Sequence, residues 1–231
     1  MPDDLEYLSL QIDTLFSHDA ARRLRYLNEP GEREAPRFFL GRTRAGNLYR
    51  FRRDLPEAII GKLEALALSE TTGKLRADPS HAAAYQEVLG EQHAVRRVGA
   101  WPAYTFPVSE MSPAGAVQIT EANKELLVGE FAWLKAILAD KEPCAAVVVE
   151  HRAVAVCHSA RTSVRAAEAG LETLSAFRGR GYAAVAARGW AALVRQQGRI
   201  PLYSTSWSNV ASQGVARKLG LIQYATDFHL T

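Results

Sequence analysis

The sequence predicts an α/β protein, and three observations lead to that prediction. From residue 144 onward, runs at strand spacing alternate with runs at helix spacing in the order β-β-β-α-β-α-β. Two glycines, Gly179 and Gly181, stand where the third of these strands gives way to an alanine-rich helix. Before residue 95 the pattern is mainly helical with one β-hairpin. We therefore expect two regions, 1–94 and 95–231.

In the N-terminal region, apolar residues recur at helical spacing through 3–27. Two short apolar and aromatic runs flank a Gly-Asn turn within 38–51, which predicts a hairpin. Further helices are predicted over 54–70, with Asp54 as the N-cap, and over 81–90. We therefore expect helices to dominate this region.

The second region begins with a strand-like run over 93–107, which Pro102 interrupts, and a predicted helix over 120–140. Three strands are expected next, over 144–150, 153–159 and 167–174. They are followed by a helix over 181–198, a strand over 201–207, a helix over 208–220 and a last strand over 221–230. The first two strands are separated by two residues, which fits a tight antiparallel hairpin.

Composition narrows the class of protein. The chain has 231 residues, 48% of them hydrophobic, and a net charge of +3, too small to indicate nucleic-acid binding. Its two cysteines, Cys144 and Cys157, lack the spacing of a metal or redox motif, so we expect free thiols in a reducing compartment. No secretory signal and no apolar run near ~20 residues is visible. We expect a soluble, cytoplasmic protein with no bound metal, nucleic acid or membrane.

The joint between the third strand and its helix has the chemistry of an anion site. Gly179 and Gly181 lack Cβ atoms, so their backbone amides can converge on a ligand at the helix N-terminus. Arg178 and Arg180 add positive charge at the same point. The pattern predicts a diphosphate cradle; the alternative is a plain tight turn with solvated arginines.

Two common phosphate loops do not fit this joint. The P-loop pattern GxxxxGK[ST] is absent from the chain. The dinucleotide fingerprint is formally satisfied by Gly179, Gly181 and Ala184. However, that fold needs an acidic residue about 20 positions later for the ribose, and no Asp or Glu occurs from Thr173 to Thr226. A dinucleotide site is therefore disfavoured.

A third pattern, [Q/R]xxGx[G/A], is matched by Arg178, Gly181 and Ala183. In this segment the chain resembles the GNAT superfamily of acyl-CoA-dependent N-acetyltransferases. A second family motif, NxxAxxxYxKxGF, is matched in part by Asn209, Lys218, Gly220 and Leu221, with Ser212 in place of its alanine. The two motifs stand in the family's order, separated by a helix and a strand. The resemblance covers about 95–231 and is clearest from about 144.

The resemblance implies a mixed, mostly antiparallel sheet flanked by helices, with acetyl-CoA as the cofactor. It implies that coenzyme A is held by Leu174, Arg178, Gly179, Arg180, Gly181, Tyr182, Ala183, Asn209 and Lys218. Asn209 can equally be a helix N-cap. The stretch without Asp or Glu carries seven cationic side chains, some of them solvated helix charges. They would attract a cofactor that carries a diphosphate and a 3′-phosphate: Arg178, Arg180, Arg188, Arg195, Arg199, Arg217 and Lys218.

Acetyl transfer to an amine also needs a group that takes the proton of the ammonium. Glu168 and Glu172 are four apart on one predicted strand, so both point to the same face. Either could be the base, and Glu172 is slightly favoured because it is nearer the loop. A surface carboxylate or an internal salt bridge is the alternative for each.

The leaving thiolate must also be stabilised or protonated. The family's frequent tyrosine is replaced by Ala216, which leaves Tyr203, Ser204 and Ser206 as weak substitutes, or solvent. The sequence thus favours direct transfer of an acetyl group from acetyl-CoA to a small-molecule or peptide amine. Two alternatives stay open: a non-catalytic acyl-CoA-binding module, and a nucleic-acid or protein-interaction domain of the same fold. The acceptor would be bound by the N-terminal region and loops around 103–120, and the oligomeric state, a homodimer included, is left open.

Overall fold

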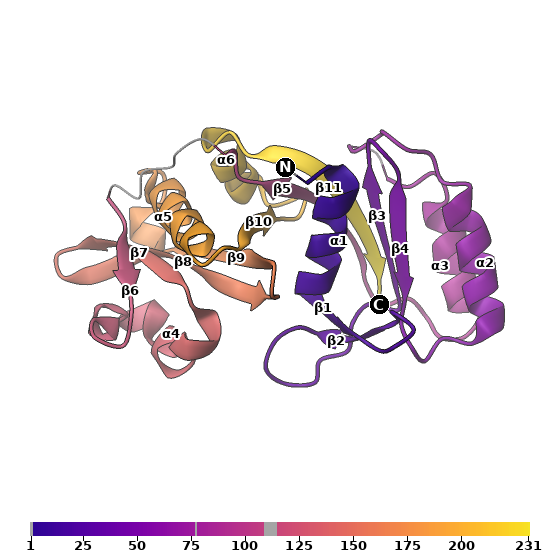
Figure 1. Ribbon diagram of the computed structural model, residues 1–231, viewed down its shortest axis with the longest axis horizontal. Helices are drawn as coiled ribbons and strands as arrows, with labels where there is room; N and C mark the ends of the chain where they lie inside the picture. The colour runs from indigo at the N-terminus through magenta and orange to yellow at the C-terminus, as the bar shows by residue number, and fades with distance from the viewer. Residues whose placement is uncertain (1, 77, 109–114) are drawn as a thin grey trace. The chain divides into compact units, whose positions relative to one another are not determined.

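A computed structural model describes residues 2–76, 78–108 and 115–231 of the chain (Figure 1). The chain divides into two compact units. Unit 1 comprises Met1–Tyr104, Ser204–Asn209 and Gln223–Thr231, and unit 2 comprises Thr105–Tyr203 and Val210–Ile222. Whether 1–94 and 95–231 are separate domains is not tested by this division and stays a prediction.

Unit 1 combines helices with a four-stranded sheet of order β4-β3-β11-β5. Strands β4, β3 and β11 pair antiparallel. The elements of unit 1 are α1 (Asp4–Leu15), β1 (Phe16–His18), β2 (Leu24–Leu27), β3 (Phe38–Thr43), β4 (Asn47–Phe51), α2 (Glu57–Leu68), α3 (Ala82–Gly90), β5 (Val98–Thr105) and β11 (Ile222–Leu230).

Strand β3 is buried along its whole length because helices cover both of its faces. Phe38 and Leu40 point to one side, into a cluster with α2 and α3. Gly41 points to the other side, where the side chain of Leu8 in α1 fills the space that a Cβ would occupy. In Figure 1, α1 accordingly lies on one side of β3 and β4, and α2 and α3 lie on the other.

The expectation of a mainly helical N-terminal region is wrong. Helix α1 ends at Leu15, and the rest of the predicted helix forms an antiparallel pair, β1 with β2. The turn between them is held by Asp19, whose Oδ1 accepts the amides of Ala21 and Arg23 at 3.0 and 2.9 Å. Aspartate binds nearby backbone amides in turns more readily than in a helix, so its side chain competes with helical spacing here.

The N-cap prediction for the helix near residue 54 is also wrong. Helix α2 is capped by Pro56 without any side-chain bond. Asp54 instead makes a two-bond ion pair with Arg52, at 2.7 and 2.9 Å. A bidentate pair with a guanidinium competes effectively for the carboxylate that would otherwise cap the helix.

Unit 2 contains a five-stranded sheet of order β10-β9-β8-β7-β6. Strands β9 and β10 are parallel, and the other neighbours are antiparallel. Its elements are β6 (Val117–Ile119), the 3₁₀ helices η1 (Lys124–Leu126), η2 (Gly129–Phe131) and η3 (Leu138–Lys141), α4 (Ala132–Ala136), β7 (Cys144–Val149), β8 (Arg152–Thr162), β9 (Ala166–Thr173), η4 (Ser175–Phe177), α5 (Tyr182–Gln196), β10 (Ile200–Ser204) and α6 (Val210–Lys218).

Helix α5 covers one face of this sheet and the region of α4 covers the other (Figure 1). On the first face, the indole nitrogen of the buried Trp190 donates to Ser159 Oγ at 3.1 Å. On the second, Phe131 and Leu134 belong to a cluster with Val156 and other apolar residues of β7 and β8. Burial of alternate residues on two sides keeps β8 fixed between the two layers.

The predicted order β-β-β-α-β-α-β from residue 144 is confirmed, as is the α/β class with mixed, mostly antiparallel sheet. The hairpin turn falls one residue earlier than expected, at Glu150 and His151, both with positive φ. The predicted helix over 120–140 is broken into short helical turns, and Gly129 has a φ of 59° at one break. Among the described residues, no helix combines the length and apolar character needed to cross a bilayer.

Candidate functional site

The glycine turn, residues 178–181, follows β9 and η4 and leads directly into α5. Gly179 has a φ of 76° and Gly181 a φ of 83°, in the left-handed region where a side chain is strained. Gly181 is also the N-cap of α5, with no side-chain bond to cap the helix. The backbone therefore turns into α5 in a conformation that favours glycine at these two positions.

The backbone amides of this turn are available to a ligand. Ala184 is the first residue to donate back into the turn, to Gly181 O at 3.1 Å. Among the described residues, the amides of 179–183 donate to no acceptor. Unpaired amides at the start of a 15-residue helix, together with its dipole, favour an anion there.

The two sequence motifs meet at this turn. The ammonium of Lys218, at the end of α6, lies 2.6 Å from the position that a Cβ on Gly181 would take. Arg180 lies over the ring of Phe177 at 5.1 Å, and Arg178 Nε donates to Thr173 O at 3.3 Å. Lys218, Arg178 and Arg180 are all exposed. The fold thus places a third cation, remote in sequence, against the glycines.

The remaining predicted coenzyme A residues lie near the turn or in unit 1. Leu174 donates its amide to Val154 O at 3.0 Å and packs against the α4 side of the sheet. Tyr182 and Ala183 form the first turn of α5. Asn209 belongs to unit 1, where its amide donates to Ser206 O at 3.1 Å. The cofactor roles of these residues stay predictions.

Some cationic side chains between Thr173 and Thr226, the stretch without Asp or Glu, have other partners. Arg195 donates to the carbonyls of Phe106 and Pro107 at 3.0 and 2.8 Å, and it tethers that segment to α5. Arg199 donates to Gln197 Oε1 at 3.1 Å. Fewer cationic side chains are therefore available to the glycine turn than the seven counted in the sequence.

The two candidate bases have different surroundings although they share β9. Glu168 is 3% exposed, and it lies opposite Arg161 across a register shift in β8. Burial lowers the pKa of Arg161, and the charge of Glu168 opposes that shift. Glu172 is exposed, yet partial burial and then the carboxylate of Glu130 raise its pKa. Of the two, Glu172 is the one that solvent reaches.

Sequence analysis did not identify the side chains that lie near Glu172. Its neighbour Gly170 lies opposite His158, whose ring occupies the space that a Cβ would take. Burial, then Lys141, lowers the pKa of His158 to about 4, so this histidine is neutral at pH 7. Trp133 is 42% exposed, and its ring packs edge-on against that of His158 with 5.6 Å between the ring centroids. Glu130 and Trp133 are grouped with Glu172 only by contacts between the sheet and the helical layer that covers it.

The substitutes considered for the missing tyrosine are engaged elsewhere. Ala216 is 2% exposed and packs within unit 2. The hydroxyl of the buried Tyr203 lies 2.6 Å from Ser212 Oγ, which joins β10 to α6. Ser206 Oγ lies 3.0 Å from Ser208 Oγ in unit 1. The predicted loops around 103–120 include 109–114, which lie outside the described residues.

Comparison with known proteins gives structural neighbours only. No protein-family profile matches the chain, and no curated protein matches it in sequence. An acetyltransferase of the GNAT family from Colwellia psychrerythraea is similar over 99% of this chain and 96% of its own, at 13% identity and a TM-score of 0.47. A conserved protein of unknown function from Staphylococcus epidermidis is similar over 97% of this chain and 96% of its own, at 10% identity and a TM-score of 0.52.

A GNAT-family protein from Novosphingobium aromaticivorans shares 22% identity over 59% of this chain, with a TM-score of 0.45. The match spans 65% of that protein, just under two thirds of its length. At these identities the similarity concerns the fold. Structural neighbours that cover most of this chain include GNAT-family acetyltransferases, at low sequence identity.

Proposed function

We propose that this chain transfers an acetyl group from acetyl-CoA to an amine. The observation that supports this most directly is the glycine turn: two left-handed glycines, amides without acceptors among the described residues, and the ammonium of Lys218 beside Gly181. A diphosphate needs several convergent donors and positive charge, and this turn supplies both. Acetyl-CoA would supply the activated acyl group as a thioester.

Glu172 is the general base in this proposal. It stands on β9, the strand that leads through η4 to the glycine turn, and its raised pKa makes it a better proton acceptor than an ordinary glutamate. The carboxylates of Glu130 and Glu172 would attract the ammonium of the acceptor. After Glu172 takes one proton, the amine nitrogen bonds to the acetyl carbon and the carbon–sulfur bond breaks. The amide nitrogen then loses its remaining extra proton to solvent, and the thiolate of coenzyme A takes a proton from solvent.

Glu168 is not assigned a proton-transfer role. It is 3% exposed and lies opposite Arg161, so an amine from solvent would not reach it as it reaches Glu172. A structural function in fixing β9 against β8 accounts for it.

A second candidate is a binding module for acyl-CoA without catalysis. The buried Ala216, where the family motif has tyrosine, favours it, since the thiolate would have no protein proton donor at that position. The two candidates share the cofactor and differ only in turnover.

The test begins with melting curves of the protein with acetyl-CoA, desulfo-CoA and NAD. A ligand that binds only the folded state raises the melting temperature by mass action. We expect both coenzyme A compounds to raise it and NAD to leave it unchanged; no rise at saturating acetyl-CoA would end the proposal. Release of free coenzyme A thiol across an amine panel then separates the transferase from the binding module.

A further inference from the structure

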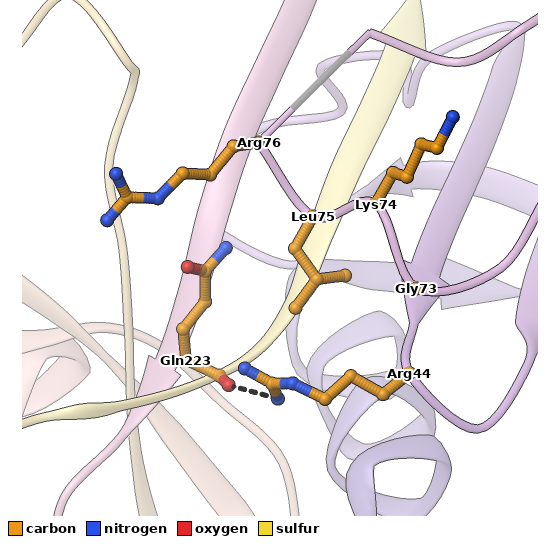
Figure 2. A pocket seen from close by; sticks show the side chains of 6 residues that line it. All are labelled: Arg44, Gly73, Lys74, Leu75, Arg76 and Gln223. Carbon is orange, nitrogen blue, oxygen red and sulfur yellow. Dashed lines mark hydrogen bonds between the residues drawn. The ribbon is translucent and has the colours of Figure 1, made fainter.

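Unit 1 contains an open hollow of about 440 Å³ that the proposed transfer reaction does not use. Its lining comes from three separate segments: the β3–β4 turn, the loop after α2 and the start of β11. The lining residues are Arg44, Gly73, Lys74, Leu75, Arg76 and Gln223 (Figure 2). The volume lies within the range of small-molecule sites, and the lining includes three cations and no carboxylate.

Two guanidinium groups flank this hollow. Figure 2 shows Arg44 and Arg76 extending on either side of Gln223, whereas Lys74 extends away from it. Arg44 donates through Nη1 to Gln223 O at 2.8 Å and to Asp4 Oδ2 at 3.2 Å. Its Nε and Nη2 donors are not used by these bonds. Among the described residues, Arg76 has neither an ion pair nor a side-chain hydrogen bond.

The loop that carries Arg76 is fixed by buried groups beneath it. The buried Arg42 donates to Lys74 O at 3.2 Å, and the buried Thr226 hydroxyl donates to Leu75 O. The amide of Gly73 donates to Thr43 O at 3.1 Å, and its φ of 86° turns the chain there. The backbone below Arg76 is therefore held by several polar bonds, although the arginine itself is exposed.

We propose that this hollow binds the phosphate group of a small phosphate monoester. A guanidinium presents its donors in a planar fork that matches two phosphate oxygens, and Arg44 and Arg76 each offer such a fork at the lining of the hollow. Leu75 is the apolar residue of the lining and would contact the non-phosphate part of the ligand.

The experiment isolates the hollow from the glycine turn by working in a Gly181→Asp background. Binding of inorganic phosphate and of glucose 6-phosphate is measured by calorimetry at fixed chloride. Arg76→Gln is the test variant, and Arg76→Lys keeps the charge but removes the fork. The matched control is Arg97→Gln, an exposed arginine whose backbone bonds to Thr231, roughly 25 Å along β11 from Gln223.

We expect millimolar or tighter phosphate binding in Gly181→Asp, at least a tenfold loss on adding Arg76→Gln, a partial loss with Arg76→Lys and no change with Arg97→Gln. Circular dichroism of each variant checks that the fold is retained. Absent binding in Gly181→Asp, or equal binding with Arg76→Gln, overturns the proposal. So does binding of a single-stranded oligonucleotide without binding of either phosphate compound.

Discussion

The glycine turn of unit 2 and the arginine hollow of unit 1 both offer positive charge, but they are built from different parts of the chain. The turn offers backbone amides of consecutive residues, and Lys218 is the cation that reaches it from elsewhere in the described part of the chain. The hollow uses side chains from three segments and no run of amides. A backbone site needs particular residues at fixed spacing, whereas a side-chain site needs only that the fold brings charges together. The first kind leaves a motif in the sequence and the second does not.

The largest expected effect breaks the backbone site. Gly181→Asp places a carboxylate where the turn would hold a diphosphate, and two like charges in such close contact cost several kcal/mol. Affinity for acetyl-CoA should fall at least ~100-fold, measured by calorimetry. Aspartate tolerates the left-handed conformation better than most residues, so the fold should persist.

Gly198→Asp is the matched control for this variant. Gly198 follows the other end of α5, has a φ of 73° and has open space where a Cβ would stand. It introduces the same charge and similar backbone strain without touching the turn. Acetyl-CoA affinity should be unchanged, and an equal loss in both variants would trace the effect to strain.

The next effect separates binding from chemistry within unit 2. Glu172→Gln removes the proposed base but keeps its shape, so kcat should fall about 100-fold or more while affinity for acetyl-CoA stays the same. Glu168→Gln serves as the comparison. A larger fall in kcat for Glu168→Gln than for Glu172→Gln would reverse the assignment of the base.

If Glu172 is the general base, turnover should depend on pH in a predictable direction. The base is active only when ionised, so kcat/KM should fall as pH drops through its pKa, which burial and Glu130 raise. A carboxyl with a raised folded pKa contributes stability at pH below its unfolded pKa and loses it as pH rises through the folded value. Glu172→Gln should therefore melt slightly higher than the parent at pH 7, and this difference should shrink near pH 4.

A smaller effect concerns the loop that carries the hollow. Glu70 accepts bonds from Ser80 N at 2.6 Å, His81 N at 3.3 Å and Tyr85 Oη at 3.2 Å. Burial opposes ionisation of Glu70, but these bonds outweigh it and lower its pKa. Glu70→Gln should cost about 2 kcal/mol of unfolding free energy in urea at pH 7.

The stability lost in Glu70→Gln should depend on pH, because only the ionised carboxylate is replaced, and this dependence serves as the control. A lowered folded pKa contributes stability above the unfolded pKa and loses it as pH falls through the folded value. The difference between Glu70→Gln and the parent should therefore shrink in acid. A cost that is equal at pH 7 and pH 3 would mean that packing, not the carboxylate, holds this loop.

The smallest expected effect concerns Tyr203, whose hydroxyl is an alternative proton donor to the thiolate. Tyr203→Phe removes the hydroxyl that meets Ser212 and should cost about 1 kcal/mol of stability. We expect kcat to change less than twofold. A loss near 100-fold would instead identify Tyr203 as the proton donor to the thiolate.

The C-terminal half was predictable because its signals are local. Gly179 and Gly181 mark the strand-to-helix turn, and the alternation from residue 144 onward sets the element order, which the structure confirms. The short range of these signals is what makes them visible in one sequence.

The errors arose where local signals compete or contacts are remote. Asp19 turns the chain in spite of helical spacing, and Arg52 captures the carboxylate of Asp54. Glu130 and Trp133 were missed because the contacts that join them to β8 and β9 cross the sheet. Arg76 was missed because its hollow exists only once β11 lies beside β3.

The position of β11 has a consequence for synthesis of the chain. Within unit 1 this strand lies between β3 and β5, and Leu230 pairs with Phe38. A ribosome makes every other strand before it makes β11, so the sheet of unit 1 stays split while unit 2 already has all five of its strands. N-terminal domains commonly fold first during translation. Here the earliest residues must wait for some of the last, and a nascent chain released early would expose the apolar edge of β3.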